Sequence, residues 1–145
     1  MVTPSSVSPG AIARDCYALS LRRAARAVSR RYDKAFAPLE LNNGQFSILA
    51  LIAGLAPVGI SELGERLEMD RTTATAALKP LVRRGLVKVE VPPADLRGRD
   101  ASLTRAGRSL LARAIPIWQR VQFKLDAALA SENGARLRTS LAELR

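Results

Sequence analysis

The chain has 145 residues, of which 48% are hydrophobic, and this length and composition are typical of one folded domain. Lysine and arginine number 23 against 13 acidic residues, and the resulting net charge of +10 favours a polyanionic partner. Histidine is absent and Cys16 is the single cysteine, which excludes imidazole-dependent catalysis and a His/Cys zinc site within one chain. We therefore expect a binding protein and not an enzyme, with no metal and no cofactor.

The N-terminal segment does not resemble a targeting signal. It is rich in Ser, Pro and Gly, and it lacks the basic start and apolar centre of a secretory peptide. We expect a flexible arm over residues 1–13, followed by a single domain over residues 14–145. No apolar stretch approaches the roughly 18 residues of a bilayer span, so the sequence predicts a cytoplasmic protein without a membrane partner.

Hydrophobic periodicity predicts mostly helices in the first half of the chain. The expected elements are a helix over 15–36, a helix over 44–53, a short strand at 58–60 and a short helix over 62–67. Pro38 and Gly54 end the first two helices. Ser61 is the expected N-cap of the short helix.

The second half begins with a capped helix and continues into a hairpin. Asp70 is the expected N-cap of a helix over 71–84, which Gly85 ends and Pro80 bends. The inner stripe of this helix is expected to be Ala74, Ala77, Leu78, Leu81 and Val82. Strands over 86–91 and 99–103, a long helix over 105–130 capped by Thr104, and a last helix follow.

This order of elements is that of a winged helix-turn-helix. The fold class we expect is mainly α, with about six helices and a small antiparallel β-hairpin wing. The DNA-binding winged helix would occupy about 42–104. Apolar stripes on the terminal helices, about 14–37 and 105–145, exceed what so small a lobe can cover and favour a homodimer. The alternative is that these helices cover each other within one chain.

Positive charge is concentrated in one part of the sequence. Residues 71–108 carry nine basic and three acidic side chains, a net charge of +6, whereas residues 41–70 carry one basic and four acidic. A face that serves only solubility mixes both signs evenly. The basic block contains the helix over 71–84 and the hairpin, and we expect these two elements to face the polyanion.

The outer face of the helix over 71–84 carries hydroxyl groups and cations. The candidate DNA-binding residues here are Arg71, Thr72, Thr73, Thr75, Ala76, Lys79 and Arg83. Threonine can donate to a phosphate or contact a thymine methyl group, and lysine and arginine place charge along the phosphate backbone. The alternative is that threonines near a helix start serve only as caps.

The tip of the hairpin adds two arginines, Arg97 and Arg99, on an exposed turn. A guanidinium group suits the narrow and electronegative minor groove. Asp95 is expected to orient the wing by holding the Arg97 guanidinium. A recognition helix followed at once by a basic hairpin places major- and minor-groove contacts on one face, so the sequence predicts binding to double-stranded DNA.

Several of these segments together resemble the MarR-type transcriptional regulators. They are Ile60 to Leu67, Met69 to Thr75, Leu78 to Leu81, Arg83 to Val87, the D-x-R motif at Asp95 to Arg97, and the L-T-x-x-G motif at Leu103 to Gly107. The resemblance extends over about residues 15–144. It implies a homodimeric repressor that binds a pseudo-palindromic operator, with one recognition helix in each major groove and Arg97 in each flanking minor groove.

The resemblance also bears on readout and on regulation. Family members often have Arg and Asn where this chain has Ala76 and Ala77, so Thr75, Lys79 and DNA shape are expected to carry more of the base readout. Many members release DNA when a small aromatic molecule enters a cleft beside the dimerisation helices. The resemblance therefore implies a small aromatic effector whose binding residues the sequence does not identify.

Cys16 provides a different regulatory signal. One branch of the family is oxidised at a cysteine early in its first helix, and Arg14 could favour the thiolate of Cys16. A lone cysteine is more often a small buried apolar residue. The sequence also leaves open a winged-helix module that binds protein or RNA without an operator, and a thiol-based peroxidase.

Overall fold

The computed structural model describes residues 7–144, and the side chains of all of these except residues 131 and 132. Its helices are α1 (Pro9–Asp15), α2 (Tyr17–Phe36), the 3-10 helix η1 (Ala37–Leu39), α3 (Asn43–Leu55), α4 (Ile60–Arg66), α5 (Arg71–Arg83), α6 (Arg105–Ala128) and α7 (Ser131–Ala142). Its strands are β1 (Val58–Gly59), β2 (Val87–Glu90) and β3 (Asp100–Leu103). The predicted winged helix-turn-helix class is confirmed.

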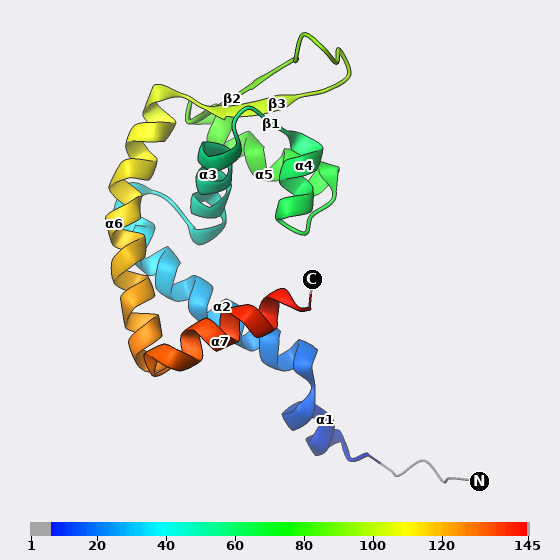
Figure 1. Cartoon of the computed structure of the whole chain (residues 1–145), viewed down its shortest axis with the longest axis vertical. Helices are drawn as coiled ribbons and strands as arrows, with labels where there is room; N and C mark the ends of the chain where they lie inside the picture. The colour runs from blue at the N-terminus through cyan, green and yellow to red at the C-terminus, as the bar shows by residue number, and fades with distance from the viewer. Residues whose placement is uncertain (1–6, 145) are drawn as a thin grey trace, which may run out of the picture.

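Two groups of elements make up the fold. The helices α3, α4 and α5 and the small sheet form a winged lobe, from which the hairpin loop projects (Figure 1). The long helix α6 runs along one side of this lobe and continues beyond it, where α2 and α7 lie. Within the described residues, none of the helices combines the length and the hydrophobicity of a membrane span.

The predicted first helix over 15–36 is divided in the structure. Cys16 has an extended backbone (φ −73°, ψ 113°), and it ends α1 and precedes α2. The backbone N–H of Ala11 donates to the Ser8 side chain, which caps α1. The part of the expected arm that begins at Pro9 therefore forms a helix, and residues 1–6 lie outside the described residues.

The helix α3 begins with a capping box. The Asn42 side chain accepts from the backbone N–H of Gln45 at 2.8 Å, and the Gln45 side chain accepts from the backbone N–H of Asn42 at 3.2 Å. These two bonds satisfy donors that the helix itself leaves unpaired. The structure extends this helix to Leu55, beyond the expected end at Ala53.

The predicted cap of α4 was wrong, because this helix starts at Ile60 with Gly59 as its N-cap. The backbone N–H of Ile60 donates to the carbonyl oxygen of Arg99 at 3.0 Å. This bond to a residue of the hairpin joins α4 directly to the sheet. Ser61 consequently lies within the first turn of the helix.

A tight turn sets α4 against α5. The backbone N–H of Met69 donates to the carbonyl oxygen of Gly64 at 2.9 Å. A Cβ atom at Gly64 would lie 2.8 Å from the Met69 carbonyl oxygen, so this position requires glycine. Asp70 then caps α5, as predicted.

The sheet has the strand order β1-β3-β2, and both of its pairs are antiparallel. Val58 lies opposite Ala101, and Val87 lies opposite Leu103. The inward-facing members of these pairs are buried, as the period of two along a strand requires. The predicted short strand therefore adds to the hairpin.

A row of aromatic rings connects the winged lobe to the long helices. The rings of Phe36 and Phe46 are 4.7 Å apart, and those of Phe46 and Trp118 are 6.5 Å apart. The Tyr32 hydroxyl donates to Oε1 of Gln122 at 2.5 Å, which joins α2 to α6. Burial, and then the negative charge of Asp126, raise the pKa of the Tyr32 phenol above its ordinary value of 10.0.

Candidate nucleic-acid interface

The first turn of α5 is fixed by Asp70. Its carboxylate accepts from the backbone N–H and from the hydroxyl of Thr73, both at 2.8 Å. These two bonds, the backbone bond first, hold the pKa of Asp70 below its ordinary value of 3.8. The start of α5 is therefore fixed by two bonds to one carboxylate.

The three threonines of this helix differ in what their hydroxyl groups do. The Thr73 hydroxyl donates to Asp70, and the Thr75 hydroxyl donates to the carbonyl oxygen of Arg71 at 2.7 Å. Their protons are thus engaged within α5, which leaves the oxygens as acceptors and the methyl groups as apolar contacts. Thr72 is exposed at the helix start. Of the two roles considered for these threonines, capping of the helix explains the presence of Thr73.

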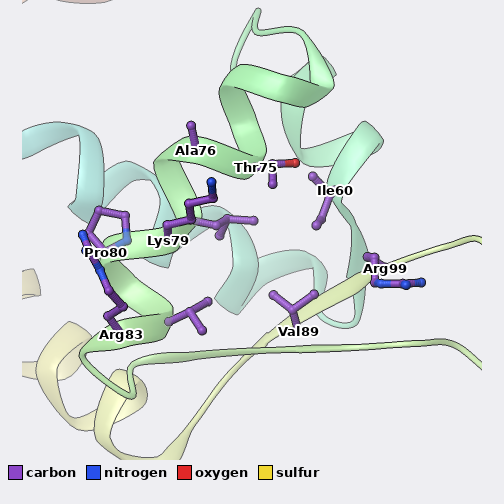
Figure 2. A pocket seen from close by; sticks show the side chains of 10 residues that line it. Ile60, Thr75, Ala76, Lys79, Pro80, Arg83, Val89 and Arg99 are labelled. Atoms are coloured by element: carbon purple, nitrogen blue, oxygen red, sulfur yellow. The ribbon is translucent and has the colours of Figure 1, made fainter.

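A groove of about 540 Å³ separates α5 from the hairpin (Figure 2). Its lining residues are Ile60, Thr75, Ala76, Leu78, Lys79, Pro80, Val82, Arg83, Val89 and Arg99. Figure 2 shows Lys79 and Arg83 along α5 and Arg99 beside the returning strand, with Val89 between them. The exposed face of α5 and the base of the wing therefore border one surface.

A second hollow, of about 340 Å³, adjoins this groove and shares Ile60 and Arg99 with it. Arg71 from the start of α5 lines it together with Arg97 and Asp95 from the wing. Arginines from the recognition helix and from the hairpin tip thus lie around the same depression. The predicted candidates Arg71, Thr75, Ala76, Lys79, Arg83, Arg97 and Arg99 line one or both of these hollows.

The hairpin tip is held by bonds within its own turn. The backbone N–H of Gly98 donates to the Asp95 carbonyl oxygen at 2.9 Å. A Cβ atom at Gly98 would lie 2.9 Å from Oδ2 of Asp95 and 3.0 Å from Cγ of Pro92. Arg99 Nη1 donates to the carbonyl oxygens of Gly98 at 2.6 Å and Leu96 at 3.4 Å. Arg99 therefore ties the turn together while it remains exposed.

Asp95 orients the wing differently from what the sequence suggested. Its Oδ1 atom accepts from the backbone N–H of Arg97 at 3.0 Å. No ion pair joins the Asp95 carboxylate to the Arg97 guanidinium in the part of the chain that the structure describes. The carboxylate thus fixes the backbone of the turn, and the Arg97 side chain extends from it into solvent.

Comparison with known proteins places this arrangement in a family. The family model of the MarR family matches residues 41–98, which include the helix-turn-helix and the wing tip. The transcriptional regulator HosA of Escherichia coli O111:H- is 32% identical over 93 residues, which are 64% of this chain and 69% of HosA. The chain belongs to the MarR family.

Solved structures extend this likeness to nearly the whole chain. The transcriptional regulator MosR of M. tuberculosis, in complex with DNA, is 38% identical with a TM-score of 0.82, covering 90% of this chain and 93% of MosR. The transcriptional repressor CouR bound to a 23-mer DNA duplex is 29% identical with a TM-score of 0.84, covering 97% and 99%. CouR bound to p-coumaroyl-CoA is 27% identical with a TM-score of 0.83, covering 95% and 96%.

The candidate site includes residues that the sequence pattern did not identify. Val82 was placed on the inner stripe of α5, but it is 40% exposed and lines the groove. Val89 and Ile60 add apolar side chains to the same lining. Helical periodicity alone could not place Val82 there, because the groove wall opposite comes from the hairpin, which follows later in the chain.

Cys16 does not line either hollow of the candidate interface, and it lies at the break between α1 and α2. Its side chain is half-buried and forms no disulfide. Arg14, the residue expected to favour its thiolate, forms an ion pair with Asp15 in which both bonds measure 2.9 Å. The guanidinium is therefore engaged by a carboxylate, and the structure gives no support to a reactive thiol.

Proposed function

We propose that the chain is a homodimeric transcriptional repressor that binds a pseudo-palindromic operator and releases it when a small effector binds. The observation that carries this proposal is the single surface on which Lys79 and Arg83 of α5 border the wing arginines. The protein would act by binding and not by catalysis, without a cofactor, on nucleoid DNA in the cytoplasm.

The helix α5 is the element that would enter the major groove. Lys79 and Arg83 would contact phosphates, and the methyl groups of Thr72 and Thr75 are suited to thymine. Ala76 offers no hydrogen-bond donor, so DNA shape would contribute more of the sequence preference. MosR and CouR, which share the fold over nine-tenths of this chain, have been solved with DNA.

The wing would enter the adjacent minor groove. Arg97 is exposed at the tip of a turn whose backbone Asp95 fixes, so the backbone of the tip needs no further ordering when the guanidinium binds. Arg99 would serve mainly to hold the turn, since it donates to two carbonyl oxygens of the tip. Arg71, beside the same hollow, would connect the two contact regions along one phosphate backbone.

The terminal helices would pair two copies of the chain. They leave large apolar side chains exposed: Ile12, Tyr17, Leu21, Val28, Ile115, Trp118, Phe123, Leu129, Leu137, Leu141 and Leu144. So many exposed apolar side chains, on α1, α2, α6 and α7 or directly after them, indicate an interface. A two-fold dimer would place two α5 helices about 34 Å apart, one turn of B-DNA.

The effector would be a small aromatic molecule. CouR, which resembles this chain over almost its full length, has been solved with DNA and with p-coumaroyl-CoA. An effector that binds more tightly to a dimer with a different separation of α5 helices lowers operator affinity by that difference. The identity of the molecule would follow from a screen for release of the operator.

Selection from random-sequence duplexes tests the proposal. The expected product is one palindromic consensus, bound by a dimer, with an affinity that falls steeply as salt rises. Binding of all duplexes with equal affinity, or a preference for RNA, would contradict it.

A further inference from the structure

Arg84, the residue that follows α5, reaches back to the end of α2. Its Nη1 atom donates to the Glu40 carbonyl oxygen at 2.5 Å, and its Nη2 atom is 3.4 Å from the Leu39 carbonyl oxygen. Both acceptors belong to the turn around η1, which continues directly from α2. One guanidinium group thus joins the end of the recognition helix to a helix of the dimerisation region.

The acceptors are held in place by the turn itself. Glu40 has a left-handed backbone (φ 51°, ψ 40°), and its N–H donates to the Ala37 carbonyl oxygen at 2.9 Å. In the described residues Arg84 forms no ion pair with a carboxylate. Its contacts are directional hydrogen bonds to fixed carbonyl groups, and such contacts define an orientation better than a flexible charge pair does.

The residues directly after Arg84 are also bonded to the start of α6. The Thr104 hydroxyl, which caps α6, donates to the Gly85 carbonyl oxygen at 2.6 Å. The backbone N–H of Thr104 donates to the Leu86 carbonyl oxygen at 3.0 Å. The segment that follows α5, Arg84 to Leu86, is therefore bonded both to the end of α2 and to the start of α6.

Arg83 and Arg84 are neighbours with different surroundings. Arg83 lines the groove beside the wing, where the proposed DNA surface lies. Arg84 lines a separate hollow with Leu39, Glu40 and Arg113. Arg83 and Arg84 carry the same charge, but Arg83 faces the proposed DNA surface and Arg84 faces the end of α2.

We infer that Arg84 is a positioning residue, which sets the orientation of α5 relative to α2 and α6 and thereby the spacing of operator half-sites that the dimer accepts. This inference rests on the proposed function. Because α2 and α6 belong to the region that pairs two copies, one Arg84 contact in each copy fixes how far apart the two α5 helices lie. Without it, α5 keeps its buried contacts through Ala74, Leu78 and Leu81, and the segment after it keeps the Thr104 bonds, but its direct link to the end of α2 is lost.

A spacing series on the selected operator tests this role. Each base pair inserted between or deleted from the half-sites moves them by about 3.4 Å and rotates them by about 35°. The wild-type dimer is expected to lose affinity steeply on either side of its preferred spacing. We compare the affinity for the operator of preferred spacing with the affinity for operators of altered spacing. In Arg84→Ala the ratio of these two affinities is expected to shrink by about two- to thirtyfold. Arg84→Lys, which retains a single donor group, should lie between the two.

Arg83→Ala is the matched control. It removes one positive charge next to Arg84, so it should weaken binding at every spacing by the same factor and leave the profile unchanged. Thermal unfolding of both variants verifies that each is folded. A spacing profile of Arg84→Ala parallel to that of the wild type would overturn the inference and leave the proposed function intact. Failure of the wild type to select any palindrome would instead overturn the proposed function.

Discussion

Arg97 is the side chain from which we expect the largest single contribution to operator binding by the wing. It extends from a turn that Asp95 and Gly98 hold rigid. Arg97→Ala should reduce operator affinity by about 1–3 kcal/mol without lowering the melting temperature. A gel-shift titration with circular dichroism measures both quantities.

Arg120→Ala is the control for charge, because Arg120 is exposed on α6 and lies outside both hollows. It should bind the operator nearly as the wild type does. Equal losses in the two variants would mean that total charge, and not the wing, determines the affinity.

Tyr32 should make stability depend on pH in the alkaline range. Because its pKa is raised in the folded state, the unfolded chain loses the phenol proton first, near pH 10.0. The contribution of Tyr32 to stability is therefore constant below that pH and falls as the pH rises from it toward the folded pKa. Tyr17→Phe leaves Tyr32 as the only tyrosine, and its absorbance should titrate above pH 10.0 in the folded protein.

Tyr32→Phe provides the complementary measurement. It removes the bond to Gln122 and should cost about 1 kcal/mol of unfolding free energy at neutral pH. It should also remove the Tyr32 part of the alkaline decrease. Titration of Tyr32 at or below pH 10.0 in Tyr17→Phe would show that the phenol is neither buried nor close to Asp126.

At the scale of the element, the contact of α6 with the start of β2 depends on one glycine. A Cβ atom at Gly107 would lie 2.0 Å from the Leu86 carbonyl oxygen, which is backbone and cannot rotate away. Gly107→Ala should therefore destabilise the fold by about 3 kcal/mol or more. Denaturant unfolding provides the measurement.

Gly54→Ala is the matched variant, since Gly54 also lies in a helix but has no atom within 4 Å of its would-be Cβ. It should be neutral or stabilise the protein by up to about 1 kcal/mol. A Gly107→Ala protein as stable as Gly54→Ala would show that α6 and β2 do not approach as closely as described.

Sequence reasoning identified those elements whose ends are determined locally. Asp70 and Thr104 were correctly predicted as caps, because a short polar side chain bonds to the backbone three residues later in the chain. Ser61 was wrong as a cap, because Ile60 is bonded to Arg99, a residue far along the sequence. The start of α5 could therefore be predicted from neighbouring residues, whereas the start of α4 could not, because it depends on a contact with the hairpin.

In the candidate site too, the residues that could be predicted are those whose role depends on their own element, and the others depend on contacts with distant residues. Charge and motif spacing indicated Lys79, Arg83 and Arg97, since these are exposed side chains on predicted elements. They could not indicate the role of Arg84, whose bonded carbonyl group at Glu40 is 44 residues away. Nor could they show that Val82 faces the groove, because the opposite wall belongs to the hairpin.

At the scale of the whole molecule, the exposed apolar residues of α7 are expected to pair with a second copy. Leu137 is 44% exposed and lies on the helix that crosses the lower end of the fold (Figure 1). Leu137→Glu places a charge in this interface and should weaken the dimer by about 2 kcal/mol or more, with a matching loss of operator binding. Analytical ultracentrifugation measures the dimer directly.

Ala53→Glu adds the same charge at an exposed position of α3, which is not one of the terminal helices. It should leave the dimer unchanged. If Leu137→Glu sediments as the wild type does, α7 is not part of the interface.

Hydroxyl-radical footprinting of the dimer on its selected duplex most directly tests whether α5 and the wing contact one double helix together. The wild type should protect two half-sites about one helical turn apart together with the minor groove that flanks each of them. Arg97→Ala should lose protection only at the flanks. The account would be contradicted if the wild type did not protect the flanking minor grooves, or if Arg97→Ala still protected them. Either result would mean that the wing does not contact the minor groove beside α5.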